Sequence, residues 1–174
     1  MYPDRFRVDA TVPGVDEPLV QVYNAGEAWV KDPKGVREAP ALMRDDFAAN
    51  VRRDTIPLLV AASRGDLSTR LVPDGETSRD GGDDVLEISG SGLMPVRLYI
   101  DDDGLIAKQA FTSAGPDGRR LPTEEVFSDY RVVNGVRVPF EATLMRNGRP
   151  VVKRSLDRVV INGPVDASLF EKPR

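Results

Sequence analysis

The sequence contains neither histidine nor cysteine in its 174 residues. Without histidine there is no Ser-His-Asp triad, no imidazole general base and no histidine-ligated zinc. Without cysteine there is no thiol nucleophile, thiolate metal site or iron–sulfur cluster. Cysteine is also absent from many proteins of oxidising and of reducing compartments, so its absence leaves the redox compartment open. We therefore predict no catalytic residue, no metal site and no cofactor.

An excess of charge of one sign and a long apolar run are also missing. The 24 Lys and Arg residues against 28 Asp and Glu residues give a formal charge of -4, which provides no electrostatic attraction to nucleic acid or anionic headgroups. No stretch approaches the roughly 18 apolar residues of a membrane-spanning helix, and the first residues lack the regions of a signal peptide. The length and the 40% of hydrophobic residues predict one globular domain over residues 1–174.

The N-terminal part has the alternation of apolar and polar residues that is typical of half-buried strands. Residues 6–12 are predicted to form one strand, followed by strands at 19–23 and 27–31 that are joined by a turn at 24–26. The sequence Asp-Pro-Lys-Gly at 32–35 is predicted to end this sheet.

From Ala41 onward the apolar residues recur every four positions, which predicts a helix with one buried face. That face carries Met43, Phe47 and Val51. A second short helix, ending at Gly65, is predicted to bury Leu58, Leu59 and Ala62.

The remainder reads as strands separated by turn dipeptides. Asp-Gly or Asn-Gly pairs, which favour tight hairpins, begin at Asp74, Asp103, Asp117, Asn134, Asn147 and Asn162. Alternating apolar stretches lie between them, at 96–100, 136–144 and 152–160. Regular spacing and short connections predict sequential neighbours in an antiparallel meander.

Such a meander must cover its apolar face, either by closing into a barrel or by curling around the helices. We predict a mainly β (α+β) fold. In it, a strongly curved antiparallel meander forms an unclosed half-barrel, with the short helical pair at about 41–64 across its concave side.

Three polar motifs resemble functional sites only superficially. Asp101-Asp102-Asp103-Gly104 has Thr112 where an EF-hand requires a bidentate carboxylate, so we interpret it as an acidic turn. The run Gly90-Ser91-Gly92 lacks the frame of a nucleophilic serine and is interpreted as a bend. Neighbouring carboxylates such as Glu124 and Glu125 point to opposite faces of a strand, so they are no acid–base pair.

Bulky or flexible apolar side chains are therefore the remaining candidates for a binding site. They adapt well to irregular apolar ligands. Packing in the core is the other interpretation of each residue, and the sequence leaves both open. The candidates for lining an apolar cavity are Trp29, Leu42, Met43, Phe47, Leu58, Leu59, Leu93 and Met94.

Several segments resemble a known family. The C-terminal sequences FSDYRVVNGVRVPF (127–140) and NGPVDASLFEKP (162–173), and the early ones YPDRFRV (2–8), VQVYN (20–24) and GEAWV (26–30), are similar to the bacterial outer-membrane lipoprotein-sorting proteins of the LolA/LolB/LppX-like superfamily. The family's N-terminal helix and first strand have no counterpart in the sequence.

The resemblance implies an unclosed β-barrel with a helical lid whose apolar concavity holds the acyl chain of a lipid or lipoprotein. It also implies a location in the periplasm or cell envelope and a non-catalytic carrier function. The missing N-terminal elements would leave a sheet edge or apolar surface open to a protein partner or a second copy in a homodimer. The alternative function is therefore an accessory protein–protein interaction domain of a larger secreted or cell-envelope assembly.

Overall fold

The structure is a computed structural model that describes residues 4–11, 14–73, 84–114 and 119–174. It is mainly β, with two α-helices, one antiparallel sheet of four strands and another of seven. The chain divides into two compact units. Unit 1 comprises Met1–Ala61 and Pro164–Arg174, and unit 2 comprises Ala62–Gly163.

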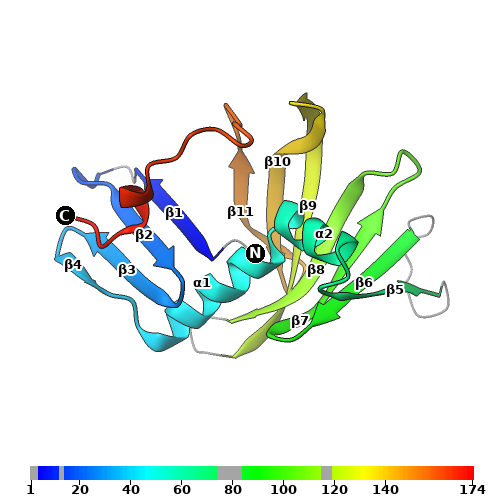
Figure 1. Cartoon of the computed structure of the whole chain (residues 1–174), viewed down its shortest axis with the longest axis horizontal. Coiled ribbons are helices and arrows are strands. Elements are labelled where there is room, and N and C mark those ends of the chain that lie inside the picture. Colours follow the sequence, from blue (N-terminus) through cyan, green and yellow to red (C-terminus); the bar gives the residue numbers. More distant parts are fainter. Residues whose placement is uncertain (1–3, 12–13, 74–83, 115–118) are drawn as a thin grey trace. The chain divides into compact units, whose positions relative to one another are not determined.

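The sheet of unit 1 contains β1 (Arg5–Ala10), β2 (Leu19–Asn24), β3 (Glu27–Asp32) and β4 (Gly35–Glu38) in sequential antiparallel order (Figure 1). The three strands predicted at residues 6–12, 19–23 and 27–31 are present, although Val8, on the predicted buried face of β1, is 46% exposed. The expectation that residues 32–35 end the sheet was wrong, because Asp32 pairs with Gly35 and the chain returns as β4. Gly35 has a φ of 106°, which a residue with a side chain rarely adopts.

Both predicted helices are present, as α1 (Ala41–Arg53) and α2 (Thr55–Ser63), with Gly65 just beyond the second. The buried residues of α1 are Phe47 and Val51. Met43 was also predicted to be buried, but its side chain is 38% exposed, since it lies in the first turn and outside the cluster that Phe47 joins.

The burial predicted for α2 needs a further correction. Leu58 is fully buried and Ala61 is buried with it, whereas Leu59 is 39% exposed. Successive residues of a helix differ by about 100° in direction, so the buried pair follows the i, i+3 spacing. Leu59 was wrongly assigned to this face, whereas Ala62, four residues after Leu58, lies on it and is half-buried.

The core of unit 1 lies between α1 and one face of the four-stranded sheet. Tyr23, Ala28 and Val30 pack with Ala39 and with the two buried residues of α1. The ring of Phe6 meets that of Phe47 edge to face, with ring centroids 4.9 Å apart. Phe6 therefore faces the core, as the alternation of the first strand predicts.

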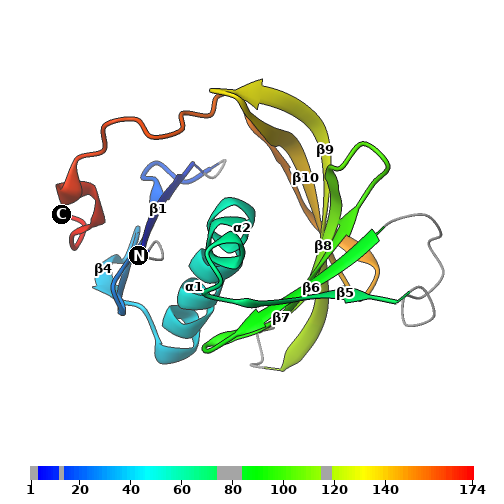
Figure 2. The same ribbon diagram turned by 45° about the vertical axis from the view of Figure 1, so that its right-hand side comes forward.

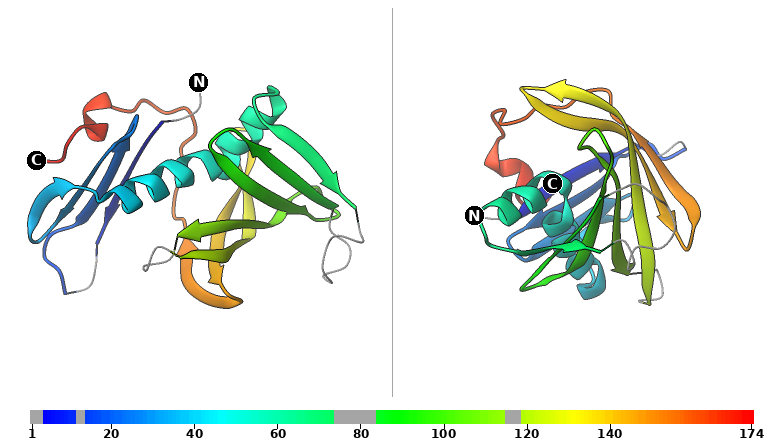
Figure 3. Two further views of the ribbon diagram at one scale, coloured as in Figure 1. Left: turned by 90° about the horizontal axis from the view of Figure 1, so that it is seen from below. Right: turned by 90° about the vertical axis from the view of Figure 1, so that its right-hand side faces the viewer.

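Unit 2 is an open sheet in which every strand pairs with its sequence neighbours (Figure 2, Figure 3). The edge strands do not pair with each other among the described residues, so this sheet is not closed, and Figure 2 shows that it curves along its long strands. The unclosed antiparallel meander is confirmed. Its strands are β5 (Ser68–Val72), β6 (Asp84–Gly90), β7 (Leu93–Ile100), β8 (Ile106–Ala114), β9 (Arg120–Val133), β10 (Val136–Arg146) and β11 (Arg149–Ser155).

Three of the predicted turn dipeptides connect neighbouring strands of the seven-stranded sheet within the described residues. Asn134-Gly135 and Asn147-Gly148 form hairpin turns in which all four residues have positive φ. Asp103-Gly104 lies in the turn between β7 and β8, and Ser91-Gly92 forms the turn between β6, which ends at Gly90, and β7. The pairs Asp74-Gly75 and Asp117-Gly118 lie outside the described residues.

The last predicted strand is shorter than expected. β11 ends at Ser155, and residues 156–163 contain no strand, so Asn162-Gly163 is not a hairpin turn. In an extended chain, Arg154 and Arg158 would lie on the same face as the apolar residues at 152, 156 and 160. This stretch therefore has no continuous apolar face to bury. The chain instead continues to a short 3-10 helix, η2 (Ala167–Phe170), in unit 1.

The helices are short compared with a bilayer. Among the described residues, none is long and apolar enough to cross a membrane.

Candidate functional site

The eight apolar candidates are distributed over four elements. Trp29 is in β3 of unit 1, and Leu93 and Met94 begin β7 of unit 2. The other five are in the helices, where Phe47 and Leu58 are buried and three are exposed, namely Leu42, Met43 and Leu59.

Trp29 and Phe47 lie on opposite faces of the four-stranded sheet. Ala28 and Val30, the neighbours of Trp29 along β3, pack in the same cluster as Phe47. Trp29 is directed to the other face, where Val22 is its partner across the strands. The structure therefore does not bring these two aromatic side chains together.

The exposed face of α2 is apolar. Ile56, Leu59 and Val60 are 39–43% exposed and follow the i, i+3, i+4 spacing of one helix face. Leu58 and Ala61 form the buried face of the same helix, and no residue from 55 to 63 is charged. A helix that is apolar on all sides is usually buried on all sides, so this exposed face is a candidate binding surface.

In unit 2, the two candidates of β7 follow the bend at 90–92. Met94 is 44% exposed, and its Sδ accepts a hydrogen bond from Nη1 of Arg120 at 2.8 Å. A thioether is flexible and polarisable, which suits contact with an irregular ligand.

One side of the seven-stranded sheet is mainly apolar, and we call it the Leu98 face after its fully buried leucine. The strand registers place Leu98 beside Leu86 and Gln109, and Gln109 beside Glu125. Among the residues that the same registers place on the Leu98 face are Leu86, Ile88, Val96, Leu98, Gln109, Phe111, Ser113, Thr123, Glu125, Phe127, Ala142, Leu144 and Arg146.

Polar groups interrupt the Leu98 face over β8 and β9. Gln109 and Thr123 are each 2% exposed, and the hydroxyl of Thr123 lies 2.7 Å from that of Ser113. Nearby, the carboxylate of Glu125 pairs with Nη2 of Arg154 at 3.0 Å. The sequence analysis did not predict this cluster of polar side chains. Gln109, Phe111 and Ser113 alternate along β8 and therefore share a face, so the sequence does indicate that polar residues lie beside an apolar one.

The opposite side of this sheet carries a charged triad. The two carboxylate oxygens of Glu87 pair with Arg97 at 2.9 Å and with Arg70 at 3.1 Å. Hydrogen bonds from Arg97 and then Arg70 lower the pKa of Glu87. These three side chains come from adjacent strands and stabilise their register.

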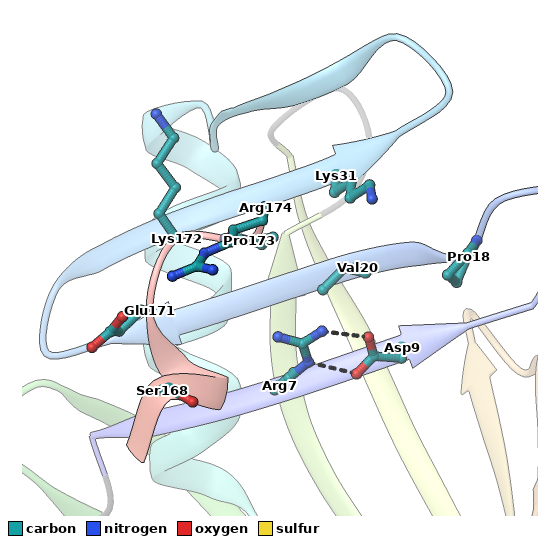
Figure 4. A pocket seen from close by; sticks show the side chains of 10 residues that line it. All are labelled: Arg7, Asp9, Pro18, Val20, Lys31, Ser168, Glu171, Lys172, Pro173 and Arg174. Carbon is teal, nitrogen blue, oxygen red and sulfur yellow. Dashed lines mark hydrogen bonds and ion pairs between the residues drawn. The ribbon is translucent and has the colours of Figure 1, made fainter. Parts of the chain in front are cut away.

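Unit 1 contains a polar cavity of about 420 Å³ on the Trp29 face of its sheet (Figure 4). Side chains from the strands form one wall, and the C-terminal segment around η2 lies opposite them. Nothing in the sequence analysis indicated this site, because the wall residues are far apart in the chain. The lining residues are Arg7, Asp9, Pro18, Val20, Lys31, Ser168, Glu171, Lys172, Pro173 and Arg174.

The central cation of this cavity is already engaged. Arg7 donates to both carboxylate oxygens of Asp9 at 2.7 and 2.8 Å, and its Nη1 donates to the carbonyl of Leu169 at 3.0 Å. The hydrogen bond from Arg7 lowers the pKa of Asp9. This arrangement fastens the C-terminal segment to the sheet, so the structural function of Arg7 is clear.

The described residues offer little for acid–base or metal chemistry. Every described carboxyl group with a clear change in its pKa is shifted downward, whereas a general acid needs an upward shift; these groups are Asp9, Asp32, Glu87, Asp129 and Asp166. Within the same part of the chain, no group of three or more acidic side chains gathers to hold a metal ion.

Comparison with known proteins gives matches in structure alone. No protein-family model and no curated protein matches the sequence. Among solved structures, a domain from Vibrio parahaemolyticus that is provisionally described as an outer membrane lipoprotein-sorting protein domain is similar to this chain. The two align with a TM-score of 0.54 at 12% sequence identity. The match covers 94% of this chain and 79% of that domain.

A second solved structure agrees with the first. The LolA superfamily protein NE2245 from Nitrosomonas europaea also has a TM-score of 0.54, at 17% identity, with 97% of this chain and 77% of that protein covered. The chain has the LolA fold. The LolA-type fold thus extends over nearly the whole sequence, as the resemblance of its strand and turn segments predicts, and identities this low establish the fold alone.

Proposed function

We propose that this chain is a non-catalytic carrier domain of the periplasm or cell envelope that binds the acyl chain of a lipid or lipoprotein. The exposed apolar face of α2 is the observation that carries the proposal. Three adjacent large apolar side chains, Ile56, Leu59 and Val60, remain exposed on a helix without charged residues. Contiguous exposed apolar surface is typical of binding sites, whereas single exposed apolar residues are common everywhere.

The fold supports the same proposal. Both structural neighbours have LolA-type folds, and the name of one refers to outer membrane lipoprotein sorting. The absence of histidine and cysteine and the downward pKa shifts of the carboxyl groups favour binding over catalysis. In addition to α2, the binding surface is proposed to include the exposed candidates of α1 in the same unit, Leu42 and Met43.

The proposal is tested with a double substitution on the exposed face of α2. Leu59→Gln together with Val60→Gln removes apolar contact area while leaving the buried residue Leu58 in place. Loss of two buried aliphatic side chains from a ligand contact should weaken binding of cis-parinaric acid at least about tenfold, at about 25 cal/mol per Å² of apolar surface. Fluorescence titration measures the affinity, and native mass spectrometry shows whether lipid from the expression host accompanies the purified protein.

Val132→Gln is the matched control, because Val132 is 71% exposed at the end of β9 in unit 2. It should leave the affinity unchanged. If the unaltered protein neither carries lipid nor binds parinaric acid, the carrier function is wrong. The alternative, a protein interaction domain, then becomes the better proposal.

One observation favours that alternative. Every residue of the edge strand β11 is exposed, including Val151 and Val152. An unpaired strand edge can add a strand from another chain, so β11 is where we propose that a protein partner or a second copy would pair. Light scattering distinguishes a homodimer from a monomer.

A further inference from the structure

The polar cavity of unit 1 has a wall whose side chains are placed by strand alternation (Figure 4). Val20 of β2 pairs with Asp9 on β1 and with Lys31 on β3, so these three side chains point to the same face of the sheet. Val20 is 3% exposed and lies between the two charged residues. This face is opposite to the one that packs against α1, and none of the eight apolar candidates lines the cavity.

The lining of this cavity is positively charged, whereas the whole chain has a formal charge of -4. Four of the ten lining residues are basic and two are acidic. The carboxylate of Asp9 is neutralised by its two hydrogen bonds from Arg7. Apart from this pair, three cations and the single carboxylate of Glu171 remain. An excess of positive charge within a cavity attracts anions, because the walls reduce the screening by water.

Both walls of the cavity have N–H groups that can donate to a ligand. Arg7 uses three of the five N–H donors of its guanidinium group within the protein, so two remain. Nζ of Lys31 lies 3.8 Å from a carboxylate oxygen of Glu17, which is longer than a hydrogen bond. On the opposite wall, Arg174 has neither a hydrogen bond nor an ion pair within the described part of the chain.

The size of the cavity indicates an organic ligand. Its volume of about 420 Å³ is within the range of small-molecule sites, roughly 300–1,000 Å³. Guanidinium and ammonium groups are typical partners of carboxylates and phosphates. The cations come from β1, from β3 and from the C-terminal segment. An anion with more than one negative charge can therefore contact donors on both walls at once.

We propose that this cavity binds a small organic anion with two or more negative charges, a dicarboxylate or a phosphate monoester. Lys31 and Arg174 bind its charged groups from opposite walls, and the remaining N–H groups of Arg7 add to them. Pro18 and Val20 contact its carbon atoms. This site is independent of the proposed carrier function, because it uses other residues on the other face of the four-stranded sheet.

Calorimetric titration at low ionic strength tests the site with charged ligands and their uncharged counterparts. Succinate and glycerol phosphate are compared with succinamide and glycerol, which have the same carbon atoms and no charge. We expect one or both anions to bind and neither uncharged compound to bind. Whichever anion binds more tightly identifies the charged group as a carboxylate or a phosphate. Added salt should weaken the binding, because ions screen the charges of the cavity.

Substitutions on both walls should change the affinity in opposite directions. Lys31→Gln and Arg174→Gln each remove a charged donor, so each should raise the Kd about tenfold, at the lower end of the strength of hydrogen bonds to charged groups. Glu171→Gln should instead lower the Kd severalfold, because it removes a carboxylate that repels the ligand. Residues that only stabilise the fold would not produce these two opposite effects.

Lys34→Gln is the matched control, because Lys34 is exposed in the turn between β3 and β4 and does not line the cavity. It changes the net charge exactly as Lys31→Gln does and should leave the Kd unchanged. Circular dichroism checks that each variant is folded. Arg174 is exposed, so Arg174→Gln still tests the site if Lys31→Gln fails to fold.

Three results would overturn this proposal. The unaltered protein could bind neither anion, or it could bind succinamide as tightly as succinate. The third result is an equal effect of Lys34→Gln and of the two substitutions in the lining, which would show that net charge alone determines the affinity. None of these results affects the carrier function, which the titration with parinaric acid tests separately.

Discussion

Tyr130 is the residue whose ionisation the structure alters most clearly. Its hydroxyl donates to the carbonyl of Ile106 at 2.8 Å. Burial raises the pKa of Tyr130 to about 12, with a smaller contribution in the same direction from the carboxylate of Asp101. The neutral phenol is therefore favoured in the folded state.

We expect this shift to make unfolding pH-dependent in alkaline solution. Because the folded pKa lies above the ordinary value of about 10, the stabilisation is complete below pH 10 and is lost as the pH rises toward 12. Absorbance titration of the tyrosines, with Tyr130→Phe as the difference, should show one phenol with a midpoint near 12. A midpoint near 10 for this residue would contradict the burial of its hydroxyl group.

Residues also show where sequence reasoning succeeds and where it does not. Phe47 is buried as its four-residue spacing predicts, since burial of α1 depends on local periodicity. The buried Nε of Arg146 has no hydrogen-bond partner within the described residues, and this was not predictable, because it depends on the register of four strands and on the carboxylate of Glu125, which pairs with Arg154. Whether Trp29 and the other apolar candidates contact a ligand stays a prediction.

Among the elements, the C-terminal segment has a function that no local pattern indicates. η2 contacts β1 and β2, and it lies on the face that carries Val20 and Val22. Val20 is 3% exposed and Val22 is fully buried. These valines alternate with Gln21 and Tyr23, so burial of Val22 and Tyr23 requires cover on both faces of β2.

Deletion of residues 164–174 should therefore destabilise unit 1. Exposing two valines that are now buried costs on the order of 3 kcal/mol of the free energy of unfolding, at about 1.5 kcal/mol or more for each side chain. Trp29, the cross-strand partner of Val22, should become more exposed, and its emission should shift to longer wavelength. Urea unfolding followed by tryptophan fluorescence measures both effects.

A milder variant serves as the control for this deletion. Arg7→Lys removes the paired hydrogen bonds to Asp9 but leaves the C-terminal segment in place. It should cost much less than the deletion, because exposed ion pairs contribute about 1 kcal/mol or less. If the deletion leaves the emission of Trp29 unchanged, the segment does not cover that face in solution.

At the scale of elements, the hairpins were the most predictable part of the fold. Asn134-Gly135 adopts the positive φ angles that the dipeptide favours. The alternation of apolar and polar residues on either side of the turn predicts the two strands. The return of the chain as β4 was missed because a proline in the turn suggested a break. The end of β11 was missed because apolar residues four apart were taken for a continuing strand.

At the scale of the whole molecule, the open antiparallel meander and its resemblance to LolA-type proteins were predictable from the sequence. Both depend on strand alternation and on turn residues, which are local properties. The separation into a four-stranded and a seven-stranded sheet was not predictable, because it depends on which strands pair across the helical segment. That residues 1–174 form a single domain stays a prediction.

Calorimetry tests that last prediction. If the chain is one cooperative domain, heating should give a single transition whose calorimetric and van't Hoff enthalpies agree. For 174 residues the enthalpy near 60 °C should be about 120 kcal/mol, at about 0.7 kcal/mol per residue. Two transitions, or a calorimetric enthalpy well above the van't Hoff value, would show that the two units unfold separately.

The bond from Arg7 to Leu169 joins residues 162 positions apart and has a consequence for biosynthesis. Unit 2 is continuous in the chain, whereas unit 1 is assembled from residues 1–61 and 164–174, which lie on either side of it. On the ribosome the four-stranded sheet emerges before unit 2, and the segment that contacts this sheet emerges only after unit 2. We therefore expect the four-stranded sheet to remain exposed to chaperones until residues 164–174 have emerged, whereas unit 2 can fold before then.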